Sequence, residues 1–304
     1  MFKTPLTAGE RLVRVRANIQ RFGYLPLLQD QTADVGTVTI CGFGPSLVNT
    51  WREIKGTVCT TSGSHDFLIA KGIIPTYHVE CDPREHKTNF IRNSHPAVMY
   101  LLNSQCHPSM FEALLPDRNV VMWHGFTDDD VDNQLALIGN LGPWSSRPIR
   151  VLAGGTNVGM RAISVMREWG HTGFELHGFD CCYHKEKQWA GEHFTQRHKT
   201  VEILVEGKVF ETSDLMMQST DDFFFKVLGQ LPGCRFRVHG DGLLETRLRL
   251  YNRDPQKALN WGWWQPVNFT VRTPENQFGV GWKEQIAAWS RRLIEKEQGS
   301  VEKV

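Results

Sequence analysis

A glycine turn near residue 43 has the composition of an anion-binding loop. It reads ICGFGPSL over residues 40–47, so Gly42 and Gly44 follow a run of apolar residues and Ser46 follows Pro45. Glycine lets the backbone turn tightly and approach a ligand closely, and amides at the start of a helix attract negative charge. The sequence therefore predicts that this turn holds a phosphate group. The alternative is a plain turn in which Ser46 only caps a helix.

A second glycine turn has a similar composition. In LAGGTNVGMRA, the glycines Gly154 and Gly155 precede Thr156 and Asn157, which open an amphipathic helix. If the sheet is parallel, both turns lie on one edge, and the two polar side chains offer hydrogen bonds to a base, ribose or phosphate. The alternative is helix capping by Thr156, which requires no ligand.

Acidic residues follow another apolar run, in HVECDPR. Glu80 and Asp82 are two residues apart and so face the same side of a strand. One of these two carboxylates is predicted to face the ligand cleft and to bind Mg²⁺ or a ribose hydroxyl, because carboxylate oxygens suit both. Arg84 either contacts a phosphate or pairs with one of these carboxylates.

A polar stretch after Asp180 carries three histidines, His184, His193 and His198. It has few core-type residues, and a mobile lid over residues 181–199 is the predicted structure. Because imidazole titrates near neutral pH, a histidine on such a lid is suited to general acid or base catalysis. The histidine spacing lacks a cysteine partner and does not predict zinc, and solvated side chains are the alternative.

The elements that must position these residues are apolar runs ending in small or polar residues. These runs are VGTVTIC, TVCTTSGS, TYHVECD, AVMYLLNS, NVVMWHG, IRVLAGG and FELHGFD. Separated by helical segments, they predict an α/β fold: a Rossmann-like, doubly wound, mainly parallel sheet with helices on both faces. Ligands in such sheets bind beyond the carboxyl ends of the strands. A hairpin, TVEILVEGKVFETS, a further helix and a last strand, CRFRVHGDG, are predicted to follow.

The predicted organisation has three parts. Residues 1–34 form a helical N-terminal appendage, residues 35–250 the nucleotide-binding domain, and residues 251–304 a helical, Trp-rich C-terminal extension. A net charge of +1 gives no electrostatic reason to expect a nucleic-acid or membrane partner. No stretch approaches the roughly 18 apolar residues of a membrane span. With seven scattered cysteines, a cytoplasmic protein with reduced thiols is expected.

Taken together, GFGPSL, TTSGS, KGIIPTYHVECDPR, GGTNVG and GFDCCY with a later histidine resemble one family over about residues 35–245. It is the 6-hydroxymethylpterin diphosphokinase-like (MptE-like) family, which includes flagellar motility accessory factors and is distantly similar to bacterial sialyltransferases. The residues that match its sites are Gly42, Gly44, Pro45, Ser46, Ser62, Gly63, Asp82, Gly154, Gly155, Thr156, Asn157, Gly178, Asp180 and His193. The chain departs from the family in reading GFDCC for GxDLA and in its Trp-rich tail, which leaves the acceptor open.

The resemblance implies nucleotide binding and one of two reactions. Members transfer diphosphate from ATP to a pterin alcohol or a nonulosonic sugar from a CMP-linked donor. The first hypothesis is a diphosphokinase-like transferase that acts on a hydroxyl acceptor such as a hydroxymethylpterin, with Asp82, Asp180 and His193 as catalytic residues and Mg²⁺ at Asp82. Alternatives are a glycosyltransferase-like enzyme using a CMP-sugar and a non-catalytic nucleotide-binding module. An NAD-dependent dehydrogenase is disfavoured, because Leu47 replaces the third glycine of its motif.

The expected partners are therefore a nucleotide, ATP or a CMP-sugar, and a small-molecule acceptor. Self-association into a homo-oligomer stays open. A P-loop kinase is disfavoured, because the chain contains no Walker-type G-x4-G-K-[ST] sequence.

Overall fold

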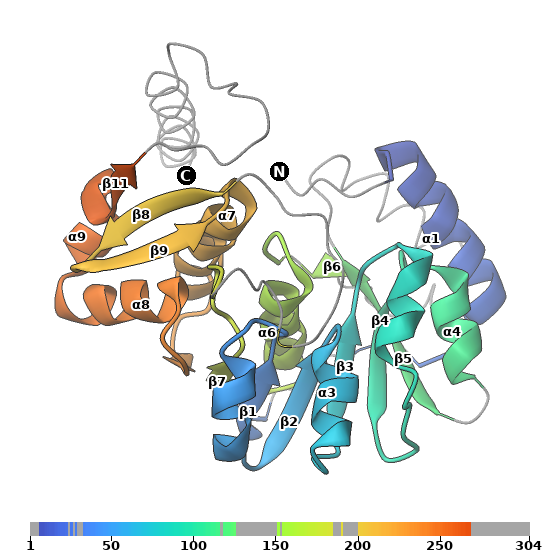
Figure 1. Ribbon diagram of the computed structural model, residues 1–304. Helices are drawn as coiled ribbons and strands as arrows, with labels where there is room; N and C mark the ends of the chain where they lie inside the picture. Colours follow the sequence, from blue (N-terminus) through green and yellow to red (C-terminus); the bar gives the residue numbers. More distant parts are fainter. Residues whose placement is uncertain are drawn as a thin grey trace.

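A parallel β-sheet forms the centre of the molecule, with helices on both faces (Figure 1). The computed structural model describes residues 6–23, 25, 26, 28, 33–115, 118–125, 151, 152, 154–184, 190 and 200–268. The strands of the sheet are β1 (Gly36–Cys41), β2 (Thr57–Thr61), β3 (Tyr77–Glu80), β4 (Met99–Asn103), β5 (Asn119–Gly125), β6 (Val151–Leu152), β7 (His171–His177) and β10 (Arg235–Val238). The predicted α/β fold is confirmed.

The order of the strands is β10-β7-β1-β2-β3-β4-β5-β6, and every pairing is parallel. The chain first builds outward from β1 to β6 and then returns to place β7 on the other side of β1. In register, Ile40 of β1 lies between Cys59 of β2 and Leu176 of β7. A reversal of this kind leaves a crevice at the carboxyl ends of the two central strands, where ligands of open α/β sheets bind.

The helices divide between the two faces. They are α1 (Ala8–Phe22), α2 (Leu47–Thr50), α3 (Ser64–Ala70), α4 (Pro108–Leu114), α6 (Val158–Glu168), α7 (Asp214–Asp222), α8 (Leu243–Arg253) and α9 (Pro255–Leu259), with short helical turns η1 (Trp51–Glu53), η2 (Glu85–Phe90), η3 (Phe223–Leu228) and η4 (Trp261–Trp263). On one face, α6 packs Met160 and Ile163 against Val38 and Ile40 of β1. On the other face, α1 and α4 pack against β4 and β5.

Helix α1 belongs to this second core. Its residues in the buried cluster are Val15, Ile19 and Phe22. Buried Asn18 donates from Nδ2 to the carbonyls of Ser104 at 2.9 Å and Cys106 at 2.8 Å, just beyond the end of β4. The segment expected to be an appendage therefore carries a helix that is part of the core.

The predicted hairpin is confirmed and forms part of a second sheet. Strands β8 (Val201–Val205), β9 (Lys208–Thr212) and β11 (Gln265–Asn268) pair antiparallel in the order β11-β8-β9. Glu206 and Gly207 both have positive φ, 50° and 79°, which matches the twist of a tight hairpin. Trp263 packs with α8 and α9 under this sheet, so the boundary expected at residue 250 falls inside α8. Residues 269–304 of the Trp-rich extension lie outside the described residues.

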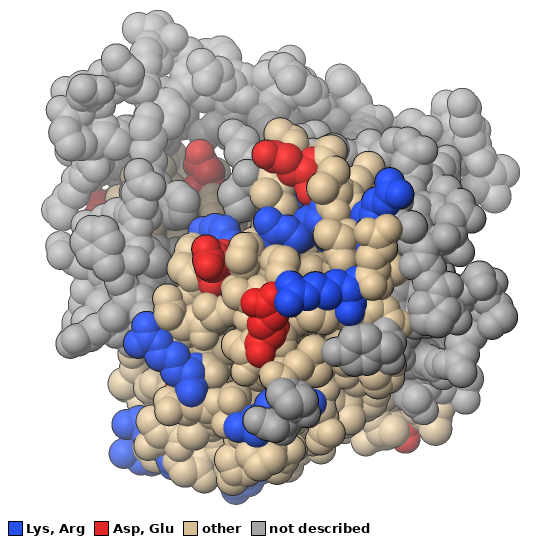
Figure 2. Space-filling view, turned by 90° about the vertical axis from the view of Figure 1, so that its right-hand side faces the viewer, with Lys and Arg blue, Asp and Glu red and all other residues tan. Residues whose placement is uncertain are grey.

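The face over α1 and α4 carries charges of both signs. Figure 2 shows basic and acidic side chains next to one another there, and Arg21 of α1 pairs with Glu112 of α4. Across the described ranges, no helix is long and apolar enough to cross a bilayer.

Candidate functional site

The first glycine turn lies against the end of β7. The amide of Gly44 donates to the carbonyl of Gly178 at 2.9 Å, and the amide of Ser46 donates to Asp180 Oδ2 at 3.1 Å. A Cβ atom on Gly44 would lie 2.2 Å from that carboxylate oxygen, and one on Gly42 would lie 2.6 Å from the Gly178 carbonyl. Glycine is therefore required by the contact between the two turns, and both amides donate to the protein itself.

Helix α2, which follows this turn, has only four residues, and the Ser46 side chain does not cap it. A phosphate at this position would have to bind groups other than the amides of Gly44 and Ser46. The sequence analysis located the turn correctly and did not anticipate that a carboxylate of the same chain contacts it.

Asp180 is central to this contact. It is 6% exposed, and its backbone carbonyl accepts the amide of Leu243 at 2.8 Å at the start of α8. Burial raises the pKa of Asp180 above its ordinary value, while hydrogen bonds from Ser46 and the nearby His184 act in the opposite direction. A carboxyl group of this kind exchanges a proton closer to neutral pH than an exposed aspartate does.

The second glycine turn makes its hydrogen bonds to α7. The amide of Thr156 donates to Asp222 Oδ2 at 2.7 Å, and the Asn157 side chain donates to Ser219 Oγ at 3.0 Å. Asn157, rather than Thr156, caps α6, because its Oδ1 accepts the amide of Met160 at 3.0 Å. The Asp222 carboxylate thus occupies the start of α6, where the sequence suggested a ligand.

The first glycine turn and the first turn of α6, which follows the second glycine turn, lie against the same aromatic ring. The ring of Phe179 lies between them: Cβ atoms on Gly42 and Gly159 would lie 3.3 Å and 2.9 Å from its ring atoms. Gly159 is two residues after Asn157 in α6. An aromatic ring thus lies between the first glycine turn and the start of α6.

The TTSGS turn after β2 continues the same edge. A Cβ atom on Gly63 would lie 2.4 Å from the ring of Phe43, so this turn packs directly against the first glycine turn. Ser62 has a left-handed backbone with φ of 53°, and its hydroxyl accepts a hydrogen bond from Lys87 Nζ at 3.0 Å. Lys87 lies in η2, and nothing in the sequence identified it as a site residue.

Asp82, after β3, is paired with two cations. Arg84 Nε lies 2.9 Å and 3.1 Å from its two carboxylate oxygens, and Lys87 Nζ lies 3.5 Å from Oδ2. Of the two roles considered for Arg84, the structure has the ion pair with Asp82. These pairs lower the pKa of Asp82, against the opposing effect of its burial.

Glu80 is a second carboxyl group that the sequence did not single out as a site residue. It is fully buried; Oε1 accepts the amides of Cys81 at 2.8 Å and Asp82 at 3.0 Å, and Oε2 has no hydrogen-bond partner. Burial raises the pKa of Glu80, and the positive charge of Lys87 opposes this shift.

A magnesium site fits these residues poorly. In the part of the chain that the structure describes, no group of three or more His, Cys, Asp or Glu side chains is placed to hold a metal ion. The Asp82 carboxylate is already neutralised by Arg84 and Lys87. Magnesium at Asp82 stays a prediction.

Comparison with known proteins agrees with this architecture. The family model described as 6-hydroxymethylpterin diphosphokinase MptE-like matches residues 15–186, more than half of the chain. The chain belongs to the MptE-like family. The MptE-like match begins within α1 and ends beyond Asp180, so it includes the whole carboxyl edge from β1 to β7. A comparison with curated proteins found no match.

A solved structure similar to this MptE-like chain is the MAf glycosyltransferase from Magnetospirillum magneticum AMB-1. The TM-score is 0.56 at 14% sequence identity, over 82% of this chain and 41% of the glycosyltransferase. The similarity shows a shared fold, and the MptE-like chain spans less than half the length of that protein.

The histidines of the predicted lid are placed only in part. His193 and His198 lie outside the described residues, as does most of the segment expected to be mobile. His184 is described and exposed. Just before it, the amide of Tyr183 donates to the carbonyl of Glu211 at 2.7 Å, so this start of the segment is joined to β9.

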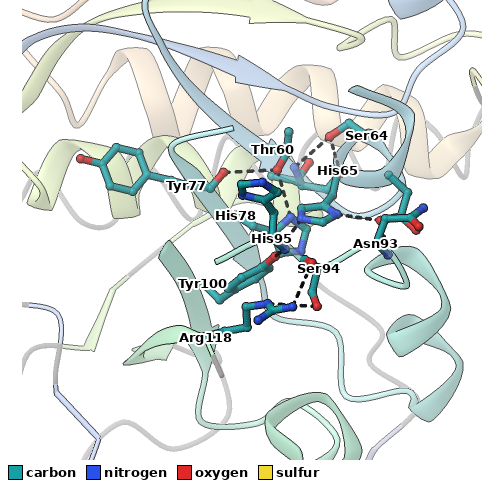
Figure 3. A network of polar contacts seen from close by, with 12 residues as sticks. Thr60, Ser64, His65, Tyr77, His78, Asn93, Ser94, His95, Tyr100 and Arg118 are labelled. Carbon is teal, nitrogen blue, oxygen red and sulfur yellow. Dashed lines mark hydrogen bonds and ion pairs between the residues drawn. The ribbon is translucent and has the colours of Figure 1, made fainter. Parts of the chain in front are cut away.

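A buried histidine network under α3 was missed by the sequence analysis (Figure 3). His65 Nε2 lies 3.1 Å from the hydroxyl of Tyr100, and His78 Nδ1 lies 3.1 Å from the hydroxyl of Thr60. The two imidazole rings are 5.0 Å apart. The only signal was a histidine inside an apolar strand run, and the network joins α3 to β2, β3 and β4 of the MptE-like sheet.

Proposed function

We propose that this protein is a nucleotide-dependent transferase that binds its donor at the carboxyl ends of β7, β1, β2 and β3. Membership of the MptE-like family supports a transferase function. The observation that carries the location is the reversal of strand order between β1 and β7, with polar turns from the adjacent strands in mutual contact at that edge.

Glycosyl transfer from a CMP-sugar is the reaction class that the charges favour. At the end of β3, two cations, Arg84 and Lys87, pair with one carboxylate, Asp82, so this group of ion pairs has one cation in excess; Glu80 beside it is fully buried, and its Oε1 accepts two backbone amides. The phosphodiester of a nucleoside monophosphate sugar carries a single negative charge and matches that excess. A triphosphate carries several negative charges, and phosphoryl-transfer enzymes neutralise them largely with Mg²⁺. The fold shared with the MAf glycosyltransferase agrees with this choice.

In this reaction the acceptor hydroxyl attacks the anomeric carbon of the sugar. The bond between that carbon and the phosphate oxygen breaks, CMP leaves with the bonding electron pair, and a base takes the hydroxyl proton. Asp180 is the candidate base among the described residues, because its pKa is raised and it lies at the crevice. His193, on the segment outside the described residues, stays the second candidate.

A second candidate function is diphosphate transfer from ATP to a hydroxyl such as that of a hydroxymethylpterin. The description of the family favours it. A protein that binds nucleotide without turnover is the remaining possibility, because GFDCC replaces the GxDLA of its relatives.

Titration calorimetry with CMP, CTP and ATP, each with EDTA and with Mg²⁺, separates these functions. We expect CMP to bind in EDTA, and at about 100 times its Kd to stabilise the fold by about 2.7 kcal/mol. CMP release from a CMP-sugar then reports turnover. Binding of ATP alone, and only with Mg²⁺, would favour the diphosphokinase, and failure of every nucleotide to bind would refute the proposal.

The role of Asp180 has its own test. Asp180→Asn keeps the shape of the side chain and should lower turnover by about 10²- to 10⁴-fold with little change in nucleotide affinity. Asp214→Asn, at an exposed position at the start of α7, is the control and should retain turnover. Unchanged turnover of Asp180→Asn would mean that another group acts as the base.

A further inference from the structure

Lys87 is unusually buried for a lysine. Its residue is 9% exposed, and its ammonium group lies 4.7 Å from the centre of the Phe90 ring. Lysine is seldom buried unless it is paired, because removing its charge from water is unfavourable. The fold therefore holds a cation at the carboxyl edge, between the ends of β2 and β3.

The contacts of this cation leave part of its bonding capacity unused. Within the described part of the chain it makes one hydrogen bond, to Ser62 Oγ at 3.0 Å. Its approach to Asp82 Oδ2, at 3.5 Å, is longer than the contacts that Arg84 makes with the same carboxylate. An ammonium group has more N–H donors than these contacts use, so an incoming anion finds free donors.

Two further features mark the surroundings of Lys87 as a site. Ser62, which positions the ammonium, has a left-handed backbone with φ of 53°, and such strain in a non-glycine residue is concentrated at functional positions. Glu80, at the end of β3 and two residues before Asp82, is fully buried, and its Oε2 has no hydrogen-bond partner. An unpaired polar atom at such depth is uncommon in a native fold.

The location agrees with a role in donor binding. Ser62 adjoins Gly63, which packs on Phe43 in the first glycine turn. Lys87 is thus one strand away from the crevice between β1 and β7. The amides of Gly44 and Ser46 in that crevice donate to Gly178 and Asp180, so the negative charge of a donor needs another partner.

We propose that Lys87, held by Ser62 and Asp82, binds the phosphate group of the donor nucleotide. This inference rests on the proposed function and adds the residue that recognises the charge of the donor. The ammonium keeps its bond to Ser62 and turns its free donors to a phosphate oxygen, while Arg84 keeps Asp82 neutralised. The ligand class is a nucleotide whose phosphate carries little charge, such as a CMP-sugar.

The test compares ligands with and without a phosphate. The probes are CMP, cytidine and inorganic pyrophosphate, titrated into wild type, Lys87→Met and Lys87→Arg. We expect Lys87→Met to weaken CMP binding by about 10- to 100-fold, the usual effect of losing a hydrogen bond to a charged group, and to leave cytidine binding unchanged. Lys87→Arg should recover most of the affinity because it keeps the charge.

A matched control is Lys71→Met. Lys71 is also a lysine near aromatic rings, with Nζ 5.6 Å from the centre of the Phe67 ring, but it lies at the far end of α3 and is exposed. Its removal should leave all three titrations unchanged. Melting temperatures of the variants check that each is folded.

The outcomes separate the two proposals. Unchanged CMP affinity in Lys87→Met, or an equal loss of CMP and cytidine affinity, would overturn the role of Lys87 and leave nucleotide binding intact. If the wild type binds pyrophosphate through Lys87 and binds no nucleotide, the anion site stands and the proposed function fails. Absence of binding by all the probes would overturn both.

Discussion

At the carboxyl edge of the sheet, contacts within the protein explain why particular residue types stand at individual positions. The absence of a side chain at Gly44 was expected to leave room for a ligand. It leaves room instead for the side chain of Asp180. The same occurs at the start of α6, where Asp222 accepts the amide of Thr156. A sequence pattern indicates that a backbone turn attracts an anion, but it does not reveal whether that anion is a ligand or a distant carboxylate of the same chain.

Gly44→Ala should therefore destabilise the fold as well as affect binding. The new Cβ atom would lie 2.2 Å from Asp180 Oδ2 and 2.6 Å from the Gly178 carbonyl. We expect a loss of about 1–3 kcal/mol in the free energy of unfolding, as for other overpacked positions, measured by urea denaturation. Gly9→Ala is the control, since no atom lies within 4 Å of its Cβ position. Equal stability of the two variants would contradict the packing of the turns.

Among the elements, α1 differs most from expectation. Its buried positions include Arg11 and Asn18 together with Val15, Ile19 and Phe22. This spacing is that of one helical face, but two of the positions are polar, which weakens the apolar stripe that marks a core helix in a sequence. The strands were easier to predict, because each is a short apolar run ended by a turn.

Asn18→Ala should show how firmly α1 is attached. The substitution removes two hydrogen bonds, at 2.9 Å and 2.8 Å, and leaves the carbonyls of Ser104 and Cys106 without them in a buried position. We expect thermal or urea unfolding to show a loss of about 2–3 kcal/mol. Arg16→Ala, at an exposed position of the same helix, should change stability by less than about 0.5 kcal/mol. A mild effect of Asn18→Ala would mean that α1 is held by its apolar face alone.

At the scale of the whole molecule, buried histidines make stability depend on pH. Burial lowers the pKa of His124 to about 4 and that of His177 to about 3, and it lowers the pKa of His78 well below its usual value. In the unfolded chain each titrates near its ordinary value of about 6.5, so the unfolded state takes up protons first as the pH falls. The stabilisation by the neutral rings is complete above about pH 6.5 and is lost below it.

His78→Asn isolates one of these groups. Asparagine keeps a polar atom for Thr60, which lies 3.1 Å from His78 Nδ1, but it does not titrate. Between pH 6.5 and 5 the variant should lose stability less steeply than the wild type, by up to about 1.4 kcal/mol per pH unit, in urea denaturation at several pH values. The comparison is needed because burial also raises the pKa of Glu80 and Asp180, which opposes the histidines on acidification. Equal slopes would mean that folding does not lower the pKa of His78.

The sequence predicted the fold class, the strands and the two glycine turns, since these depend on local patterns. It did not predict the order of strands or the role of Lys87, because both depend on contacts between distant segments. Lys87 follows an unremarkable polar stretch, and only the fold brings it to Ser62, 25 positions earlier in the chain.

The position of β1 between β2 and β7 has a consequence for how the chain is made. β1 meets β2 after a short connection, but its pairing with β7 joins Gly36 to His171, which lie 135 positions apart. Contacts between such distant segments form late, because a long loop must first be closed. During synthesis one edge of β1 therefore stays unpaired until β7 has left the ribosome. The crevice between these strands therefore forms only after β2 to β6 have been made, and a chain stopped before residue 171 would expose an aggregation-prone edge.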